Sequence, residues 1–129
     1  SGKDLLTDPP TGDSLKFNFL NLDTGLTKGK SIDLAFYQFA ASTYTLKGEI
    51  KNILYASFSH YVQLPSTIPT LFFEIKNSET GQIILAKETR NGRLNRPGTY
   101  RTNNIFTMLF KGNSTSTIYT PSILIQQHL

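Results

Sequence analysis

Residues Thr70–Lys87 read T-L-F-F-E-I-K-N-S-E-T-G-Q-I-I-L-A-K, and this stretch decides the fold class. Two runs rich in β-branched, aromatic and aliphatic residues, Thr70–Lys76 and Gln82–Lys87, flank the five residues N-S-E-T-G. Two such runs around a short polar loop that ends in glycine are typical of a β-hairpin. We therefore predict two antiparallel strands joined by a loop over Asn77–Gly81.

The same kind of segment recurs on both sides of this hairpin. The further strand candidates are Leu15–Phe19, Ile32–Phe39, Thr43–Ile50, Ile53–Leu64, Asn104–Phe110 and Thr117–Gln126. Turn signals such as Lys28-Gly29-Lys30 and the polar stretch 111–116 separate the candidates, and no helical period is convincing. About eight short strands predict an all-β protein, an antiparallel β-sandwich with jelly-roll connectivity, with a small barrel as the competing fold.

Three of these segments carry more specific expectations. In Ile53–Leu64 the alternation predicts one long half-buried strand, with His60 partly buried on its apolar side. Its apolar face would hold Leu54, Ala56, Phe58, Val62 and Leu64, and its other face Tyr55, Ser57, Ser59, Tyr61 and Gln63. Gly48 weakens the preceding strand, and Pro121 places the last strand at a sheet edge or at a bulge.

Length and composition predict one domain with its own core. A chain of 129 residues is of single-domain size. Residues 1–14 contain Pro9-Pro10 and Gly12, which favours a linker or a shaft-to-head connection, and residues 15–129 form the predicted binding domain. The chain has no cysteine, which excludes disulfides, thiol nucleophiles and Cys-type metal sites. No apolar run approaches about 18 residues, so we predict no membrane insertion.

The basic residues concentrate in Lys87–Arg101, K-E-T-R-N-G-R-L-N-R-P-G-T-Y-R, with Glu88 as the one acid. A guanidinium is a planar, permanently charged fork that matches two oxygens of a carboxylate or sulfate, and amides and a tyrosine ring suit a sugar. The alternative is a solvated loop, or arginines that pair with acids of a neighbouring subunit. The predicted ligand-binding residues are Arg90, Arg93, Asn95, Arg96, Tyr100, Arg101 and Asn103.

Motifs for catalysis are missing from the sequence. The two histidines, His60 and His128, have no motif around them, and the nine carboxylates show no spacing that would tune one as an acid and another as a base. No phosphate-binding glycine loop is present. We therefore predict no catalytic residue, no cofactor and no metal. Asn113-Ser114-Thr115 is a glycosylation sequon, meaningful only in a protein secreted through a eukaryotic pathway.

Two resemblances to known families follow from particular residues. The segment Leu5-Leu6-Thr7-Asp8-Pro9-Pro10, followed by short strands and the terminal Ile123–Gln126, resembles the hinge and head of adenovirus-like trimeric fibres, although the tryptophan of that hinge is absent. Tyr55–Ser59, Phe72–Ile75, Gly98–Arg101 and Phe106–Met108 are similar in rhythm to jelly-roll carbohydrate-binding modules, including those of phage tails. Both resemblances imply a sandwich that binds without turnover.

These observations predict a non-enzymatic receptor- or glycan-binding head domain of a viral or phage fibre. It would attach the virion to a host cell surface, act on the virion surface or outside the cell, and form a homotrimer. Its partner would be a cell-surface glycan or a protein receptor. The alternatives are a capsid-decoration or pilus module, an appended carbohydrate-binding module, a nucleic-acid-binding barrel and, last, an enzyme. The basic residues lack interleaved aromatics along one groove, so we predict no nucleic-acid partner.

Overall fold

The computed structural model describes residues 14–25, 27–65, 67, 70–88, 93–95, 105–115 and 118–128. Regular secondary structure in these ranges consists of strands, and none of the described residues belongs to a helix that could cross a membrane. The strands are β1 (Ser14–Asn21), β2 (Ile32–Ala40), β3 (Thr43–Ile53), β4 (Val62–Pro65), β5 (Thr70–Asn77), β6 (Ile83–Leu85), β7 (Arg93–Asn95), β8 (Ile105–Thr115) and β9 (Ile118–His128).

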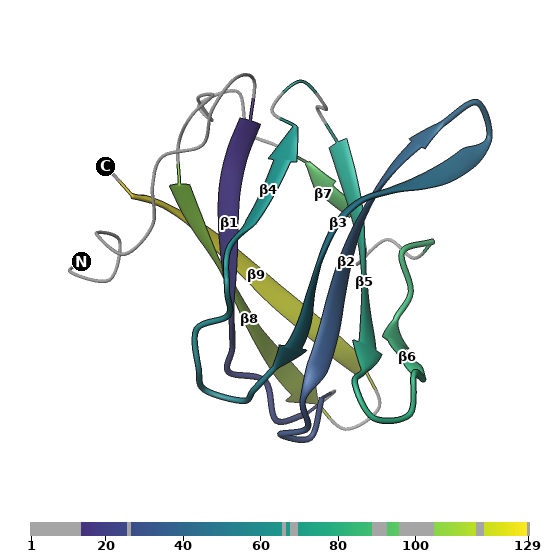
Figure 1. The fold of residues 1–129 in the computed structure, drawn as a ribbon. Coiled ribbons are helices and arrows are strands. Elements are labelled where there is room, and N and C mark those ends of the chain that lie inside the picture. Colours follow the sequence, from purple (N-terminus) through teal and green to yellow (C-terminus); the bar gives the residue numbers. More distant parts are fainter. Residues whose placement is uncertain are drawn as a thin grey trace.

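The strands form two sheets that face each other, so the predicted all-β sandwich is confirmed (Figure 1). One sheet has the order β4-β1-β8-β9. The other has the order β3-β2-β5-β6, and β7 also pairs with β5. Strand β2 occupies one edge of β5, while β6 and β7 follow one another along its other edge.

One pairing departs from the predicted antiparallel arrangement, because β1 and β8 run parallel from Lys16↔Ile105 to Asn21↔Phe110. Parallel neighbours need a long connection, and here the whole second sheet lies between the two strands in sequence. Jelly-roll connectivity is antiparallel throughout, so it is not confirmed. A buried hydrogen bond of 2.7 Å from the Thr107 hydroxyl to the Asn18 side-chain oxygen also joins this parallel pair.

The core lies between the sheets and is rich in phenylalanine. Alternate residues of β1, β2, β4 and β5 point inward, and the largest fully buried side chains include Phe17, Phe19, Phe36, Phe73 and Phe110. Phe17 of one sheet stacks on Phe36 of the other, with ring centroids 6.4 Å apart. Each fully buried ring contributes about 2 kcal/mol by leaving water, so this layer supplies a large share of the fold's stability.

The predicted strand over residues 53–64 is wrong. Strand β3 ends at Ile53, one residue after the left-handed Asn52 (φ 56°), and β4 begins only at Val62. Between them the left-handed backbone of Ala56 (φ 60°) interrupts the extended conformation. Leu54 and Phe58, expected to be buried, are 61% and 48% exposed.

The end of the same connection lies beside β1 and carries a second correction. The Ser59 amide donates to the Phe19 carbonyl at 2.8 Å, which extends the β4 edge of β1. His60 is exposed rather than partly buried, since it follows this contact outside any strand. Of the two tyrosines placed on the other face, Tyr55 is exposed and Tyr61 is half-buried.

Most of the predicted turns are confirmed. Lys28 (φ 55°) and Gly29 (φ 70°) are the central residues of a type I′ turn closed by a 3.0 Å bond from the Lys30 amide to the Thr27 carbonyl. The β5–β6 hairpin turns over Asn77–Gly81, with Gly81 at φ 75°. Both turns lie at the same end of the sandwich (Figure 1).

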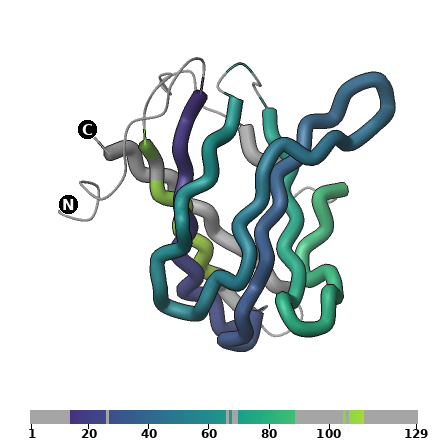
Figure 2. Tube along the Cα trace, viewed as in Figure 1, coloured from purple at the N-terminus to yellow at the C-terminus, as the bar shows by residue number. Residues whose placement is uncertain are grey.

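The predicted loop 111–116 is wrong over most of its length. Strands β8 and β9 continue as a ladder to the pair Thr115↔Ile118, so the sequon asparagine Asn113 lies in β8 and pairs with Thr120. Strand β9 is an edge of its sheet, which confirms the placement of Pro121 at an edge. The chain trace in Figure 2 shows the start of β8 running beside β1, with which it pairs.

Gly48 marks a close approach between β3 and β4 of the other sheet. It lies at an irregularity in the β2–β3 ladder, and a Cβ atom added there would lie 2.8 Å from Val62 Cγ2 and 2.9 Å from Leu64 Cδ2. Both neighbours are buried, and the valine is stiff about its χ1 angle.

We expect Gly48→Ala to lower the free energy of unfolding by about 1–3 kcal/mol because the added methyl group overpacks the core. Urea denaturation measures the change. In a Val62→Ala background the cost of Gly48→Ala should shrink, since the methyl group that it meets is gone. Equal costs in the two backgrounds would show that contact with Val62 is not the cause.

Candidate binding face

The outer face of the β3-β2-β5 sheet collects the densest set of interacting polar and aromatic side chains that the structure describes. Strand alternation turns Ile32, Leu34 and Phe36 of β2 inward and leaves Asp33 and Tyr37 on the outer side. On β5 the outer side carries Phe72, Glu74 and Lys76, and on β3 it carries Tyr44, Glu49 and Lys51.

The register of the strands divides this face into two halves. Phe39↔Tyr44 and Tyr37↔Phe72 are paired near the β2–β3 hairpin. Asp33↔Lys76 and Ala35↔Glu49 are paired toward the other end of the strands. We call Tyr37, Phe39, Tyr44 and Phe72 the aromatic patch, and Asp33, Glu49, Lys51, Glu74, Lys76 and Lys87 the ionic lattice.

The rings of the aromatic patch touch one another in tilted and edge-to-face pairs. The centroid of Tyr44 lies 4.7 Å from that of Phe39 and 5.6 Å from that of Phe72. Such pairs contribute about 0.5–1.5 kcal/mol each beyond the area that they bury. Phe39 nevertheless remains 49% exposed, and Leu46, the ladder partner of Tyr37, is 48% exposed. The patch is therefore an ordered apolar surface that is open to solvent.

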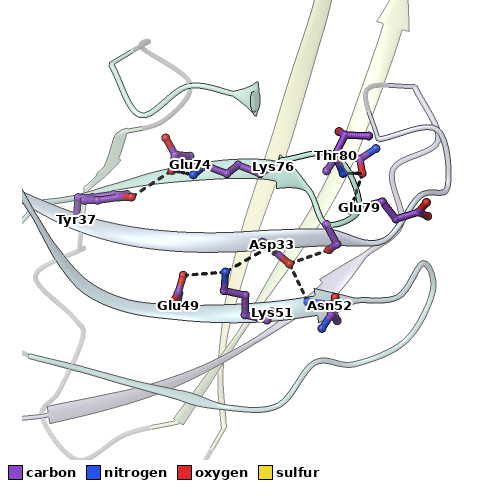
Figure 3. A network of polar contacts seen from close by, with 11 residues as sticks. Asp33, Tyr37, Glu49, Lys51, Asn52, Glu74, Lys76, Glu79 and Thr80 are labelled. Atoms are coloured by element: carbon purple, nitrogen blue, oxygen red, sulfur yellow. Dashed lines mark hydrogen bonds and ion pairs between the residues drawn. The ribbon is translucent and has the colours of Figure 1, made fainter. Parts of the chain in front are cut away.

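Glu74 lies at the centre of one of the two groups of contacts in the ionic lattice (Figure 3). Its side chain is only 3% exposed. Its carboxylate accepts a hydrogen bond from the Tyr37 hydroxyl at 3.2 Å. The Nζ atoms of Lys76 and Lys87 lie 3.5 Å and 3.6 Å from its oxygens. A buried carboxylate needs such partners, because an unpaired buried charge costs several kcal/mol.

Lys87 joins the two halves of the face. Its Nζ lies 2.9 Å from Glu88 and also 4.9 Å and 5.1 Å from the ring centroids of Tyr37 and Tyr44. The hydrogen bond to Glu88 and the charge of Glu74 together outweigh desolvation and raise the pKa of Lys87. Partial burial, followed by the Glu74 charge, raises the pKa of the Tyr37 hydroxyl, which stays protonated. Lys87 is thus a fixed cation over the edge of the aromatic patch.

Asp33 joins β2 and β3 to the β5–β6 loop at the other end of the lattice (Figure 3). Its Oδ1 accepts bonds from the Asn52 amide at 2.9 Å and the Ser78 hydroxyl at 2.7 Å, and Lys51 Nζ lies 3.7 Å from its Oδ2. Partial burial acts to raise the pKa of Asp33, but the two hydrogen bonds and the lysine outweigh it and hold the pKa below its usual range. The contact with Asn52 holds the left-handed residue near the end of β3.

The lattice encloses only a shallow depression. The depression measures about 40 Å³ and is lined by Asp33, Ala35, Tyr37, Glu49, Lys51, Glu74 and Lys76. Each of its three carboxylates faces a lysine rather than another acid. Among the described residues, no three His, Asp or Glu side chains come together as metal ligands.

Two of the seven ligand-binding residues predicted from the sequence lie beside this face. Arg93 and Asn95 lie on β7, where their backbones pair with Phe72 and Thr70. The other predicted ligand-binding residues, Arg90, Arg96, Tyr100, Arg101 and Asn103, lie outside the described residues.

The sequence interpretation missed the aromatic patch and the ionic lattice. Alternation in Ile32–Phe39 and Thr70–Lys76 contains a usable signal, because most of the residues opposite the apolar face of these runs are aromatic or charged. It does not show that the two runs pair, so only the structure brings Tyr37 beside Glu74.

Comparison with known proteins identifies no family for this chain. No protein-family model matches the chain, and no curated protein matches it significantly. The resemblance to a fibre head domain accordingly stays a prediction.

We expect Asp33→Asn to lower stability by about 1 kcal/mol at neutral pH, since the charged acceptor strengthens both hydrogen bonds. The folded-state pKa is depressed, so the contribution of Asp33 is present above the unfolded pKa of about 3.9 and is lost as the pH falls through the folded value. Urea unfolding of the two proteins at about pH 7 and pH 2 measures this convergence.

Glu79→Gln is the matched control, because it removes the same charge from an exposed residue of the neighbouring hairpin loop. A stability deficit of Asp33→Asn that stays constant down to the lowest pH would contradict the role of the ionised carboxylate.

Proposed function

We propose that this domain is a non-enzymatic binding module whose aromatic patch holds a neutral sugar unit of a cell-surface glycan. The observation that carries the proposal is an ordered set of four rings on a rigid sheet, with Phe39 half exposed and fixed polar groups beside it. Ligand sites combine apolar and aromatic surface with a few well-placed polar groups, and this face has that composition.

A sugar fits the chemistry of the aromatic patch. The C–H bonds on one face of a pyranose ring carry partial positive charge, and the face of an aromatic ring is negative. The hydroxyl groups at the rim of the sugar need donors and acceptors, which Lys76, Glu49 and Lys51 of the ionic lattice supply at the surface. Stacking would give the affinity, and the lattice would give the orientation.

The charge balance of the face favours a neutral sugar. Lys51, Lys76 and Lys87 each lie within ion-pair distance of a carboxylate of the same face or, for Lys87, also of Glu88. An acidic sugar would have to compete with these carboxylates for every lysine. This differs from the acidic ligand that the arginine-rich segment predicts.

We place the module, as part of the same proposal, at the end of a viral or phage fibre as a homotrimer. The support is the resemblance of residues 5–10 and 123–126 to a fibre hinge and head. A specific observation also favours the second candidate, a structural or interaction module: Leu54, Tyr55 and Phe58 are 61%, 40% and 48% exposed within one short connection. Contiguous exposed apolar side chains are typical of protein contacts.

We expect Phe39→Leu to weaken binding to a neutral glycan about fivefold, which corresponds to about 1 kcal/mol, because leucine keeps the apolar volume but has no ring face. A glycan array followed by titration calorimetry measures the change. Phe58→Leu is the matched control, since Phe58 is exposed to nearly the same degree outside the aromatic patch. The proposal would be contradicted if the wild-type domain bound no neutral sugar, or if both variants lost the same amount of affinity.

We expect the wild-type domain to sediment as a trimer and Leu54→Ser to shift it toward the monomer, because a polar side chain weakens an apolar subunit contact. Analytical ultracentrifugation at several concentrations measures the mass. Leu46→Ser is the control on the other exposed leucine, which lies on the binding face. A monomeric wild-type domain would count against the fibre head and leave the sugar-binding proposal standing.

A further inference from the structure

A second concave site lies at the end of the sandwich, between the Thr27–Lys30 turn and the β5–β6 hairpin. It is a cavity of about 350 Å³ lined by Thr27, Lys28, Lys30, Asn77, Gln82, Ile83 and Ile84. The volume is at the lower end of the range for small-molecule sites. None of its lining residues belongs to the aromatic patch or the ionic lattice, so the cavity is separate from the proposed sugar site.

Its first wall is fixed by buried hydrogen bonds beneath the turn. The Asp23 carboxylate accepts the Thr27 amide at 3.0 Å, and the Thr27 hydroxyl donates to the Asp23 carbonyl. The Asn21 amide group donates to the Thr27 hydroxyl oxygen at 3.3 Å, and all three residues are buried. The type I′ turn that carries Lys28 and Lys30 therefore stands on a rigid base.

The second wall is fixed by Asn77. Its side-chain oxygen accepts the amides of Glu79 and Thr80 at 2.8 Å and 3.1 Å, which also identifies the remaining side-chain atom as the NH₂ group. Its backbone bonds to Gln82 and Gly81 at 2.8 Å close the hairpin. Asn77 thus brings a donor group to the cavity lining, and Gln82 adds a second side-chain amide.

The charged residues that line the cavity, Lys28 and Lys30, are both basic. Lys28 and Lys30 are exposed, and neither has a carboxylate within ion-pair distance in the part of the chain that the structure describes. The lysines of the ionic lattice, by contrast, all have such partners. No lining residue of the cavity is acidic. Two free ammonium groups with amide and hydroxyl groups form a site for an anion.

The rest of the lining is apolar. Ile83 is 50% exposed although it belongs to a strand, and Ile84 packs against the core. An inorganic anion would leave this surface in contact with water. A ligand that has both a carboxylate and a short apolar body would satisfy both parts of the lining.

We propose that this cavity binds a small carboxylate with an apolar body, with Lys28 and Lys30 holding the carboxylate and Ile83 and Ile84 contacting the apolar part. Two kinds of molecule combine a carboxylate with an apolar body in this way: a free short-chain acid and a peptide whose C-terminal residue is leucine. The site is independent of the sugar-binding proposal, since it shares no residue with that face.

Titration of the ¹⁵N-labelled domain with hexanoate tests the proposal. We expect saturable amide shifts in residues 27–30 and 77–84, weaker effects from acetate, which has no apolar body, and none from hexanol, which has no charge. Lys28→Gln/Lys30→Gln should weaken hexanoate binding about fivefold to tenfold, as expected for two exposed ion pairs. Lys47→Gln/Lys111→Gln is the matched control, because it removes the same charge from lysines outside the cavity.

Absence of shifts in these residues, or equal weakening in both double variants, would overturn the proposal. A peptide that ends in leucine and its C-terminal amide distinguish the two sources: binding of the acid form alone, tighter than hexanoate, would identify a chain terminus. Phe39→Leu should bind hexanoate as the wild type does, and Lys28→Gln/Lys30→Gln should keep its sugar binding. The two proposals can therefore fail separately.

Discussion

The buried carboxylate of Glu74 is the constraint on which the outer face of the β3-β2-β5 sheet depends. A charge at this depth is tolerated only with close partners, and the structure supplies the Tyr37 hydroxyl and the ammonium groups of Lys76 and Lys87. Meeting that requirement orders Tyr37 and places Lys87 over two tyrosine rings. Lys76 and Lys87 are therefore paired with a carboxylate, and the aromatic rings are the part of this surface that is left to contact a ligand.

Between the sheets the sandwich is stabilised by apolar packing. The inward layer of phenylalanine and aliphatic side chains holds the sheets together, and Gly48 lets β3 approach Val62 and Leu64 closely. Asp33 then links the end of β3 to the β5–β6 loop. The strand ladders and hydrogen bonds hold both the aromatic patch and the cavity near Lys28 and Lys30 in place, which would lower the entropic cost of binding the proposed ligands.

Strands were predictable where alternation and turn chemistry agree. β1, β2 and β5 follow runs in which every second residue is apolar, and Gly29 and Gly81 mark turns that need a left-handed backbone. Residues 53–64 have the same alternation but form a connection. The sequence does not show this, because the left-handed residues Asn52 and Ala56 are not glycines. The reverse error occurs at 111–116, where a polar composition hides a ladder that continues along the sheet edge.

The sequence by itself determined the strand class, the apolar side of most strands and the two glycine turns, because these depend on neighbours only one to four residues apart. It also contained the outward residues of the aromatic patch and the ionic lattice without revealing that they meet. Only the tertiary structure decided which strands lie side by side and in which register. It also decided that β1 and β8 run parallel. The physical reason is that a strand's own pattern specifies its buried face, whereas its neighbours are selected by the packing of the two sheets as a whole.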